Sequence, residues 1–183
     1  GVESFCGTQD LGTGTRTVCM MVVAETLGLE PDQIKVNIGS SKLPVSGASG
    51  GSTTVGAVSE SHRRASQDAI RHIFGLVGKK LGVPADELVA SGGRISAKGN
   101  RDKSLSWKEA ARLLGLKPAE FTASHRRGDK SPLSSEGVGG VKMAEVMDAL
   151  ETGVIKIENI VDAQDMGPII DTTVAAPLLN ENR

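Results

Sequence analysis

The stretch Gly7-Thr-Gln-Asp-Leu-Gly-Thr-Gly-Thr-Arg-Thr17 combines glycines, hydroxyl side chains and one arginine, and it leads directly into an apolar segment over residues 18–27. A glycine loop that opens a helix presents free backbone N–H groups and the positive end of the helix dipole. The spacing fits neither G-x-G-x-x-G nor the P-loop, because no glycine stands at Thr17 and no lysine lies nearby. The residues alone leave two interpretations open, an anion-binding loop and a plain turn between strand and helix.

A second loop of the same kind covers residues 39–54 and ends in Gly50-Gly-Ser-Thr-Thr54. It leads into a long predicted helix in which polar residues such as His62 fill the faces outside an apolar stripe. The stripe recurs every four positions, at Ala65, Ala69, Ile73, Val77 and Leu81. The hydroxyls of residues 52–54 also suit a helix N-cap. Two such loops favour one shared site for a ligand with phosphate or other anionic groups.

The remaining segments predict short elements. Residues 2–6 and 34–38 read as strands, and residues 94–97 as another. Ser106 and Glu109 have the spacing of a capping box, with Trp107 as a packing residue in the first turn of a short helix. Residues 141–147 and 154–163 predict a hairpin around a glycine-bearing turn, and Asp165-Met-Gly-Pro168 ends its second strand. Residues 122–140 predict a mobile surface loop, with His125 facing solvent.

Composition excludes several functional classes. Hydrophobic residues make up 38% of the chain and aromatic residues 2%, which predicts an aliphatic core. A net charge of −1 argues against nucleic acid or an anionic membrane surface as partner. No apolar run is long enough for a membrane span. Cys6 and Cys19 read as small buried hydrophobes, and neither they nor the histidines have the spacing of a metal site.

The order of these motifs resembles the molybdenum-binding subunit of the xanthine dehydrogenase and aldehyde oxidase family. The resemblance covers the first loop with its apolar helix, the second loop with its long helix, and the hairpin that runs into Asp165-Met-Gly167. It implies an α+β fold of two-layer mixed sheets with packed helices, as in a molybdenum cofactor-binding domain. It also implies that the chain is a C-terminal region fragment, inactive when isolated. The start at Gly1, inside an apparent strand, agrees with a piece of a longer protein.

The resemblance implies that the two loops bind molybdopterin with molybdenum, in bacteria often as the cytosine dinucleotide. The first loop would flank the pterin, and the second would hold the phosphate end through hydroxyl and N–H groups. At Thr13 many relatives have glutamine, whose side chain reaches further. The implied cofactor-binding residues are Gln9, Leu11, Gly12, Thr13, Gly14, Thr15, Arg16, Ser49, Gly50, Gly51, Ser52, Thr53 and Thr54.

The reaction implied by the resemblance is hydroxylation of an aldehyde or a nitrogen heterocycle, a small-molecule substrate. Because the dithiolene of the cofactor holds the metal, no protein metal ligand is expected. The catalytic base of the family is a glutamate in a short motif, and none of Glu136, Glu145, Glu158 and Glu181 lies in that motif, so no catalytic residue is named. The implied partners are the rest of the molybdenum subunit and the subunits or domains that carry 2Fe-2S and FAD.

We expect three segments: a loop-and-helix lobe over residues 1–89, a variable helix and mobile loop over 90–140, and a hairpin that begins the next lobe over 141–183. Two other functional hypotheses stay open. In one, the chain is a stand-alone module that binds phosphate or nucleotides. In the other, it is a structural lobe whose glycine loops are only turns. The substrate, the electron acceptor and the compartment, cytoplasmic or periplasmic, are not indicated by the residues.

Overall fold

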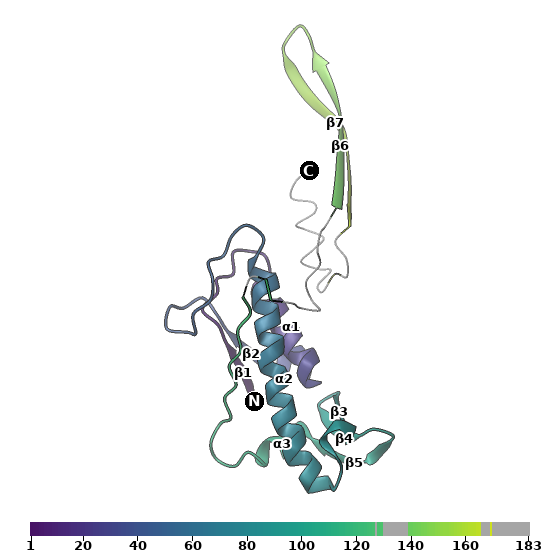
Figure 1. Cartoon of the computed structure of the whole chain (residues 1–183). Helices are drawn as coiled ribbons and strands as arrows, with labels where there is room; N and C mark the ends of the chain where they lie inside the picture. The colour runs from purple at the N-terminus through teal and green to yellow at the C-terminus, as the bar shows by residue number, and fades with distance from the viewer. Residues whose placement is uncertain (127, 130–138, 166–168, 170–183) are drawn as a thin grey trace. The chain divides into compact units, whose positions relative to one another are not determined.

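The computed structural model describes residues 1–126, 128–129, 139–165 and 169 (Figure 1). The chain divides into two compact units, Gly1–Ser131 and Pro132–Arg183, which are described separately below. The first unit combines helices with two small sheets, and the second contains a β-hairpin. These helices and small sheets confirm the expected α+β class. The three-segment division at residues 89 and 140 stays a prediction.

A β-α-β arrangement begins the first unit. β1 (Val2–Phe5) and β2 (Ile34–Asn37) form a parallel pair, connected through α1 (Thr15–Leu27) and a short 3-10 turn. Period-two alternation along β2 turns Ile34 and Val36 inward, where they are 5% and 8% exposed. Because the strands are parallel, the loops that follow β1 and β2 leave from the same edge of the pair.

The long helix α2 (Thr54–Leu81) follows the second loop and packs against α1. Its buried face differs from the predicted stripe, because Val58, His62, Ser66 and Ile70 are buried in its first part, followed by Ile73 and Val77. The prediction that His62 lies on another face is wrong, since that residue is 6% exposed. A strict four-residue row drifts by about 40° per step around an α-helix, so only a row with an occasional three-residue step stays on one face. Here that step joins Ile70 to Ile73.

A second sheet lies beyond the end of α2. Its strands, which begin at Leu88, Arg94 and Asn100, pair antiparallel in chain order, and the capping box predicted for Ser106 and Glu109 is present at the start of the short helix that follows. The Trp107 indole Nε1 donates to the Leu27 carbonyl oxygen at 2.9 Å, which confirms its packing role. The elements are β3 (Leu88–Ser91), β4 (Arg94–Ala97), β5 (Asn100–Ser106) and α3 (Trp107–Arg112).

The core of the first unit is aliphatic, as the composition predicts. Cys19, Val77, Ile95 and Ala110 are 0% exposed, and they come from α1, α2, β4 and α3. Both cysteines are buried free thiols, in agreement with their interpretation as small hydrophobes. Burial, with a smaller contribution from neighbouring Cys6, raises the pKa of the Cys19 thiol to about 12.

The raised pKa of Cys19 predicts an unreactive thiol. Only the thiolate attacks iodoacetamide, so we expect Cys19 in the native chain to be alkylated at least about a hundredfold more slowly than in urea at about pH 8. Mass spectrometry of the peptide that contains Cys19 measures the two rates. Equal rates in the native and unfolded chains would contradict the buried position.

The second unit contains the predicted hairpin. β6 (Gly139–Ala149) and β7 (Val154–Asp165) pair antiparallel around a turn in which Gly153 has a φ of 67°. Apolar side chains on the ribbon are largely exposed within this unit, for example Met143 at 66% and Ile155 at 67%. β7 ends at Asp165, the first residue of the predicted strand end, while residues 166–168 and about half of the predicted mobile loop lie outside the described residues.

Candidate functional site

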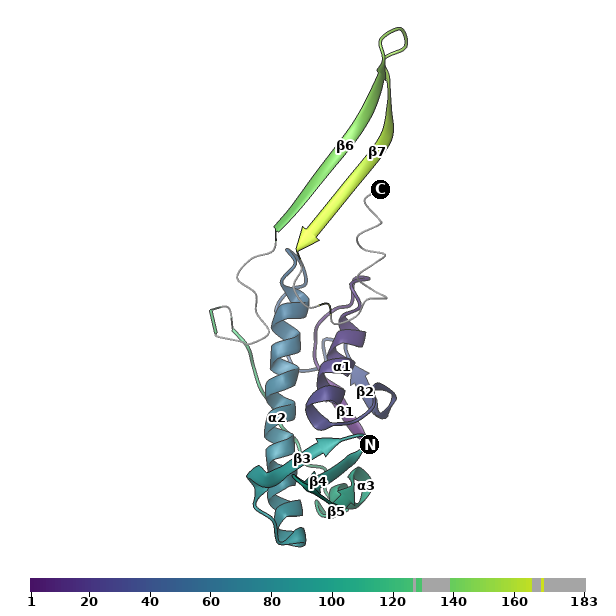
Figure 2. The ribbon, with the colours of Figure 1, turned by 90° about the vertical axis from the view of Figure 1, so that its right-hand side faces the viewer.

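The two glycine loops lie together at one end of the first unit. Figure 2 shows α1 and α2 running side by side, with the loops at the ends where both helices begin. Two backbone hydrogen bonds join the loops directly, because Gly7 donates to the Pro44 carbonyl oxygen at 2.7 Å and Gly39 donates to that of Thr8 at 2.8 Å. A Cβ atom at position 7 would stand 2.8 Å from the Pro44 carbonyl oxygen, so this approach requires glycine.

The loops carry the starts of two packed helices. Gly14, with φ 72°, is the N-cap of α1, and Thr53 is the N-cap of α2. Because α1 and α2 pack together and both begin at this end, the positive ends of their dipoles lie on the same side of the unit. The arrangement offers N–H groups from two helices to one ligand.

In the first loop, several candidate residues already have partners within the chain. The Arg16 guanidinium donates from Nη1 to the Val36 carbonyl oxygen at 2.6 Å, which holds it on β2. The backbone N–H of Arg16 donates to Oδ2 of Asp10 at 3.1 Å, and the hydroxyls of Thr13 and Thr15 are 3.1 Å apart. Thr15 is 1% exposed, whereas Leu11 is 69% exposed. The exposed residues of this loop are Gln9, Asp10, Leu11, Gly12, Thr13 and Arg16.

The second loop leaves more donors available. Thr53 occupies the N-cap position as predicted, but its hydroxyl donates to the Gly50 carbonyl oxygen at 2.9 Å and makes no capping hydrogen bond with α2. Gly50, Gly51 and Ser52 are exposed, and Ser52 adopts a φ of 56° that non-glycine residues rarely take. The Oγ atom of Ser49 is buried and has no hydrogen-bond partner among the residues that the structure describes.

These differences separate the two loops electrostatically. The Asp10 carboxylate occupies a backbone donor in the first turn of α1 and places a negative charge there. No side chain in the described part of the chain accepts a hydrogen bond from the first turn of α2. An anionic group is therefore favoured at residues 49–54, and a neutral polar group at residues 9–13. The donor set fits a ligand with an anionic end and an uncharged polar part.

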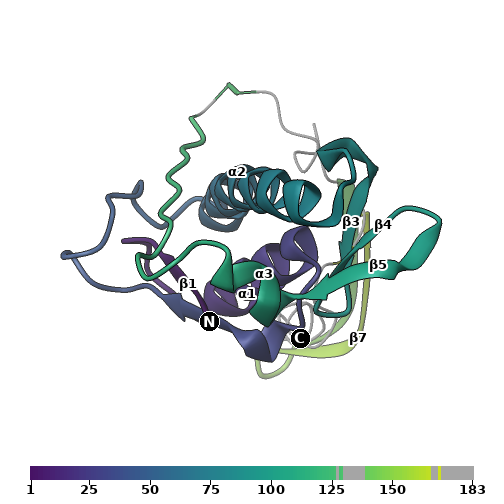
Figure 3. The same cartoon turned by 90° about the horizontal axis from the view of Figure 1, so that it is seen from below.

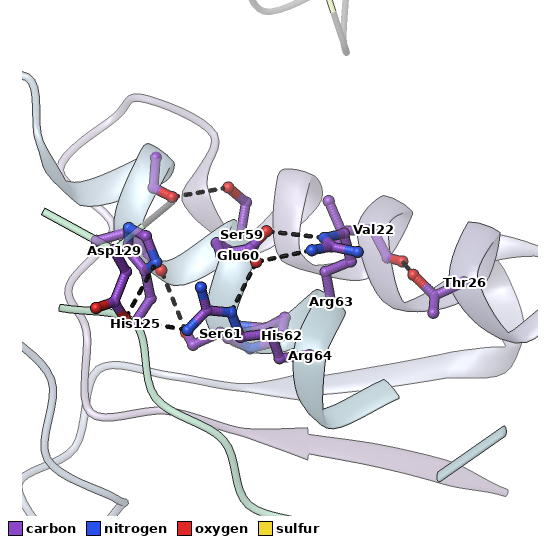
Figure 4. Close-up of polar contacts among 12 residues, drawn as sticks. Val22, Thr26, Ser59, Glu60, Ser61, His62, Arg63, Arg64, His125 and Asp129 are labelled. Atoms are coloured by element: carbon purple, nitrogen blue, oxygen red, sulfur yellow. Dashed lines mark hydrogen bonds and ion pairs between the residues drawn. The ribbon is translucent and has the colours of Figure 1, made fainter. Parts of the chain in front are cut away.

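A buried ion cluster, which no pattern in the sequence predicts, lies in the first half of α2. Figure 4 shows Glu60, 1% exposed, between two arginines of the same helix. Its carboxylate accepts from Nε and Nη2 of Arg63 at 2.8 Å each and from Nε of Arg64 at 2.8 Å. Spacings of three and four residues place these side chains on one face, but charged residues in such a row ordinarily lie in solvent.

The same cluster holds a loop segment that follows α3. Nη1 of Arg64 donates to the Ser124 carbonyl oxygen at 3.0 Å and to Oδ2 of Asp129 at 3.1 Å. The Arg126 backbone N–H, which has the larger effect, and the Arg64 guanidinium hold the pKa of the Asp129 carboxyl below its usual range. The His125 side chain is 13% exposed, so its predicted solvent-facing position is wrong. The hydrogen bonds from Arg64 hold Ser124 and Asp129 next to α2.

The structure gives no sign of a protein-ligated metal in its described residues. No group of three or more His, Cys, Asp or Glu side chains is placed for a metal ion within the described part of the chain.

Burial lowers the pKa of His62, whose Nδ1 lies 2.6 Å from the Val58 carbonyl oxygen. Among the described helices, none is long and apolar enough to cross a bilayer.

Comparison with known proteins identifies this arrangement. Residues 1–176 match the family model of the molybdopterin cofactor-binding domain. The chain belongs to this family. Its sequence resemblance to molybdenum hydroxylases is thus supported at the level of the cofactor-binding domain.

Among its relatives, one of the subunits of nicotinate dehydrogenase from Pseudomonas putida is 33% identical over 109 residues, which are 59% of this chain and 9% of the relative. The matched part of this chain therefore spans only a small part of the length of that relative.

Two solved structures share the fold. Quinoline 2-oxidoreductase from Pseudomonas putida 86 matches with a TM-score of 0.79 and 18% identity, covering 93% of this chain and 22% of that chain. The Cu,Mo-CO dehydrogenase matches with a TM-score of 0.75, 21% identity and the same coverage. These matches confirm the expected fold of a molybdenum cofactor-binding domain.

Proposed function

We propose that the chain forms part of the cofactor site of a molybdenum hydroxylase that oxidises an aldehyde or a nitrogen heterocycle. The observation that carries the proposal is the placement of two hydrogen-bonded glycine loops at the shared start of two packed helices, in a chain of the molybdopterin-binding family. Nicotinate and quinoline, after which two of the related proteins are named, are both nitrogen heterocycles, which favours that substrate class.

Each loop has its own part in the proposed site. N–H groups and hydroxyls of Ser49, Gly50, Gly51, Ser52, Thr53 and Thr54 hold the phosphate end of the cofactor, in its dinucleotide form if the host makes one. The exposed residues of the first loop, Gln9, Leu11, Gly12 and Thr13, lie along the pterin. Gly14, Thr15 and Arg16 support the shape of that loop, because the exposed Arg16 side chain is bonded to β2 and Thr15 is buried.

The bound cofactor supplies the two-electron redox chemistry of the hydroxylation. The chain itself binds, orients and shields the cofactor, and we assign no catalytic base to it. Since the chain spans 22% of the quinoline oxidoreductase chain, the base and most of the substrate pocket belong to other parts of the protein. Iron–sulfur and flavin centres on other chains or segments complete the electron path.

Metal and pterin analysis tests the proposal. Protein isolated from a host that synthesises molybdopterin is expected to contain molybdenum and pterin in equal amounts, measured by elemental analysis and by the fluorescence of the oxidised pterin. Phosphate or nucleotide without molybdenum would support a stand-alone anion-binding module instead. Absence of any such ligand from a folded preparation would support a purely structural lobe.

A variant at Gly50 tests the place of the ligand. A Cβ atom at Gly50 meets nothing within 4 Å in this chain, so Gly50→Ala leaves the fold unaffected. With the phosphate end bound against this backbone, the added methyl group is expected to weaken cofactor retention about tenfold. The measurement is the rate of pterin loss during dialysis.

Gly47→Ala is the matched control for this variant. A Cβ at Gly47 also meets nothing within 4 Å, and the residue lies in the same loop but outside residues 49–54. It is expected to retain the cofactor at the native rate. Equal loss in both variants, or none in Gly50→Ala, would place the phosphate end elsewhere.

A further inference from the structure

The chain separates its charge along its length. Residues 79–117 contain nine lysine and arginine residues against four aspartate and glutamate residues, a net charge of +5. The complete chain has a net charge of −1, so the rest of it carries −6. The basic residues are Lys79, Lys80, Arg94, Lys98, Arg101, Lys103, Lys108, Arg112 and Lys117, and we call the surface that they form the basic surface.

The basic surface lies at the end of the first unit opposite the glycine loops. It comprises the last turn of α2, the sheet β3–β5, α3 and the residues up to Lys117, and Figure 3 shows the sheet and α3 beside the end of α2 when seen from below. Helix α2 begins at the second loop and has 28 residues, which gives it a length of about 42 Å. The charges are therefore too far from the proposed phosphate site to hold the cofactor.

The nine cations form no ion pairs within the described chain, although Arg94 and Arg112 act electrostatically on the Glu109 carboxylate. All nine are exposed, and none forms an ion pair with another described residue. Elsewhere exposed cations do pair, as Lys35 does with Glu3 and Arg71 with Asp68. The segment itself contains acidic residues that form no such pairs, so the unpaired cations are not explained by a lack of nearby carboxylates. Like charges gathered on one surface repel each other unless a partner neutralises them.

We propose that the basic surface docks an acidic protein partner. Nucleic acid fits less well, because the chain as a whole is negative and its only tryptophan, Trp107, is half-buried with its indole bonded to Leu27. A carboxylate-rich protein surface matches both the sign of the charge and the absence of exposed aromatic platforms on β3–β5. Such contacts steer association and set specificity more than they add affinity.

The test uses the full chain and a fluorescein-labelled peptide of about 20 glutamates as the probe. A triple variant, Arg101→Glu, Lys103→Glu and Lys108→Glu, reverses three charges whose side chains have no described hydrogen bond. A control triple, Lys35→Glu, Arg71→Glu and Lys156→Glu, changes the net charge equally but at cations that are already paired. Fluorescence anisotropy at several salt concentrations measures the dissociation constant of the peptide.

The native chain and the control triple are expected to bind the peptide within about twofold of each other, and the first triple at least about tenfold more weakly with a smaller salt dependence. Equal loss in both triples would show that only net charge matters and would overturn the proposal. Tighter binding of a single-stranded oligonucleotide of the same length would also overturn it. So would salt-dependent self-association, measured by sedimentation, that the first triple abolishes, since the occupant would then be a second copy.

Discussion

Replacing Gly28 with alanine is expected to lower the free energy of unfolding of the first unit by about 4 kcal/mol, through strain in the backbone and overlap with β3. Gly28 is the C-cap of α1 and has a φ of 67°, where a side chain is strained. A Cβ atom there would stand 2.4 Å from the carbonyl carbon of Ala90 and 2.7 Å from the backbone nitrogen of Ser91. Backbone atoms cannot rotate away as a flexible side chain does.

Urea denaturation followed by Trp107 fluorescence measures this effect, because the single tryptophan of the chain lies in the first unit, bonded to Leu27. Gly82→Ala is the matched control. Gly82 is the C-cap of α2 with a φ of 65°, but a Cβ there meets nothing within 4 Å. It is expected to cost only about 1 kcal/mol, the strain of the left-handed conformation. Equal losses in the two variants would show that α1 and β3 are further apart than described.

Replacing Glu60 with glutamine is expected to lower the free energy of unfolding by about 3 kcal/mol, the lower end for a broken buried ion pair. Glu60 is 1% exposed and accepts three hydrogen bonds from Arg63 and Arg64. A neutral amide cannot neutralise either guanidinium, and its NH2 group would face donors. The expected loss is at the lower end because the two arginine side chains are 21% and 30% exposed and are partly rehydrated.

The control for Glu60→Gln is Asp68→Asn, which breaks an exposed ion pair with Arg71 on the same helix and at the same three-residue spacing. This change is expected to cost less than about 0.5 kcal/mol. The same fluorescence-detected urea transition serves for both variants. Similar small effects would mean that water reaches Glu60 and that the cluster does not support α2.

Local patterns in the sequence predicted much of the first unit. The alternation at Ile34 and Val36 predicted β2, and the spacing of Ser106 and Glu109 predicted the start of α3. The hairpin around Gly153 was also predicted, because its turn residue and alternating strands are adjacent in the chain. Each of these features depends on contacts between residues that are close in sequence.

The site was predicted less completely. The two loops were expected to share one ligand, and the parallel order of β1 and β2 does bring them to one end. The sequence does not predict the hydrogen bonds that give the two loops different properties. They join the N–H of Arg16 to the Asp10 carboxylate and the Arg16 guanidinium to the Val36 carbonyl oxygen. These partners are set by how the loop and β2 lie in space, and no spacing rule connects them.

The sequence by itself determined the three helices, the strands β1, β2 and β4, the hairpin and the two glycine loops, because caps, periodicity and turn residues act over a few positions. It did not predict β3 and β5, which are recognised by their pairing with β4. Tertiary structure alone decided which polar groups are buried. Glu60 is buried with Arg63 and Arg64 as its partners, and Arg64 also bonds to Ser124 and Asp129, which lie on either side of the 13% exposed His125 side chain. The three- and four-residue spacing of Arg63 and Arg64 makes them available as partners of Glu60, but whether other elements cover this face of the helix and exclude water from it depends on packing in three dimensions.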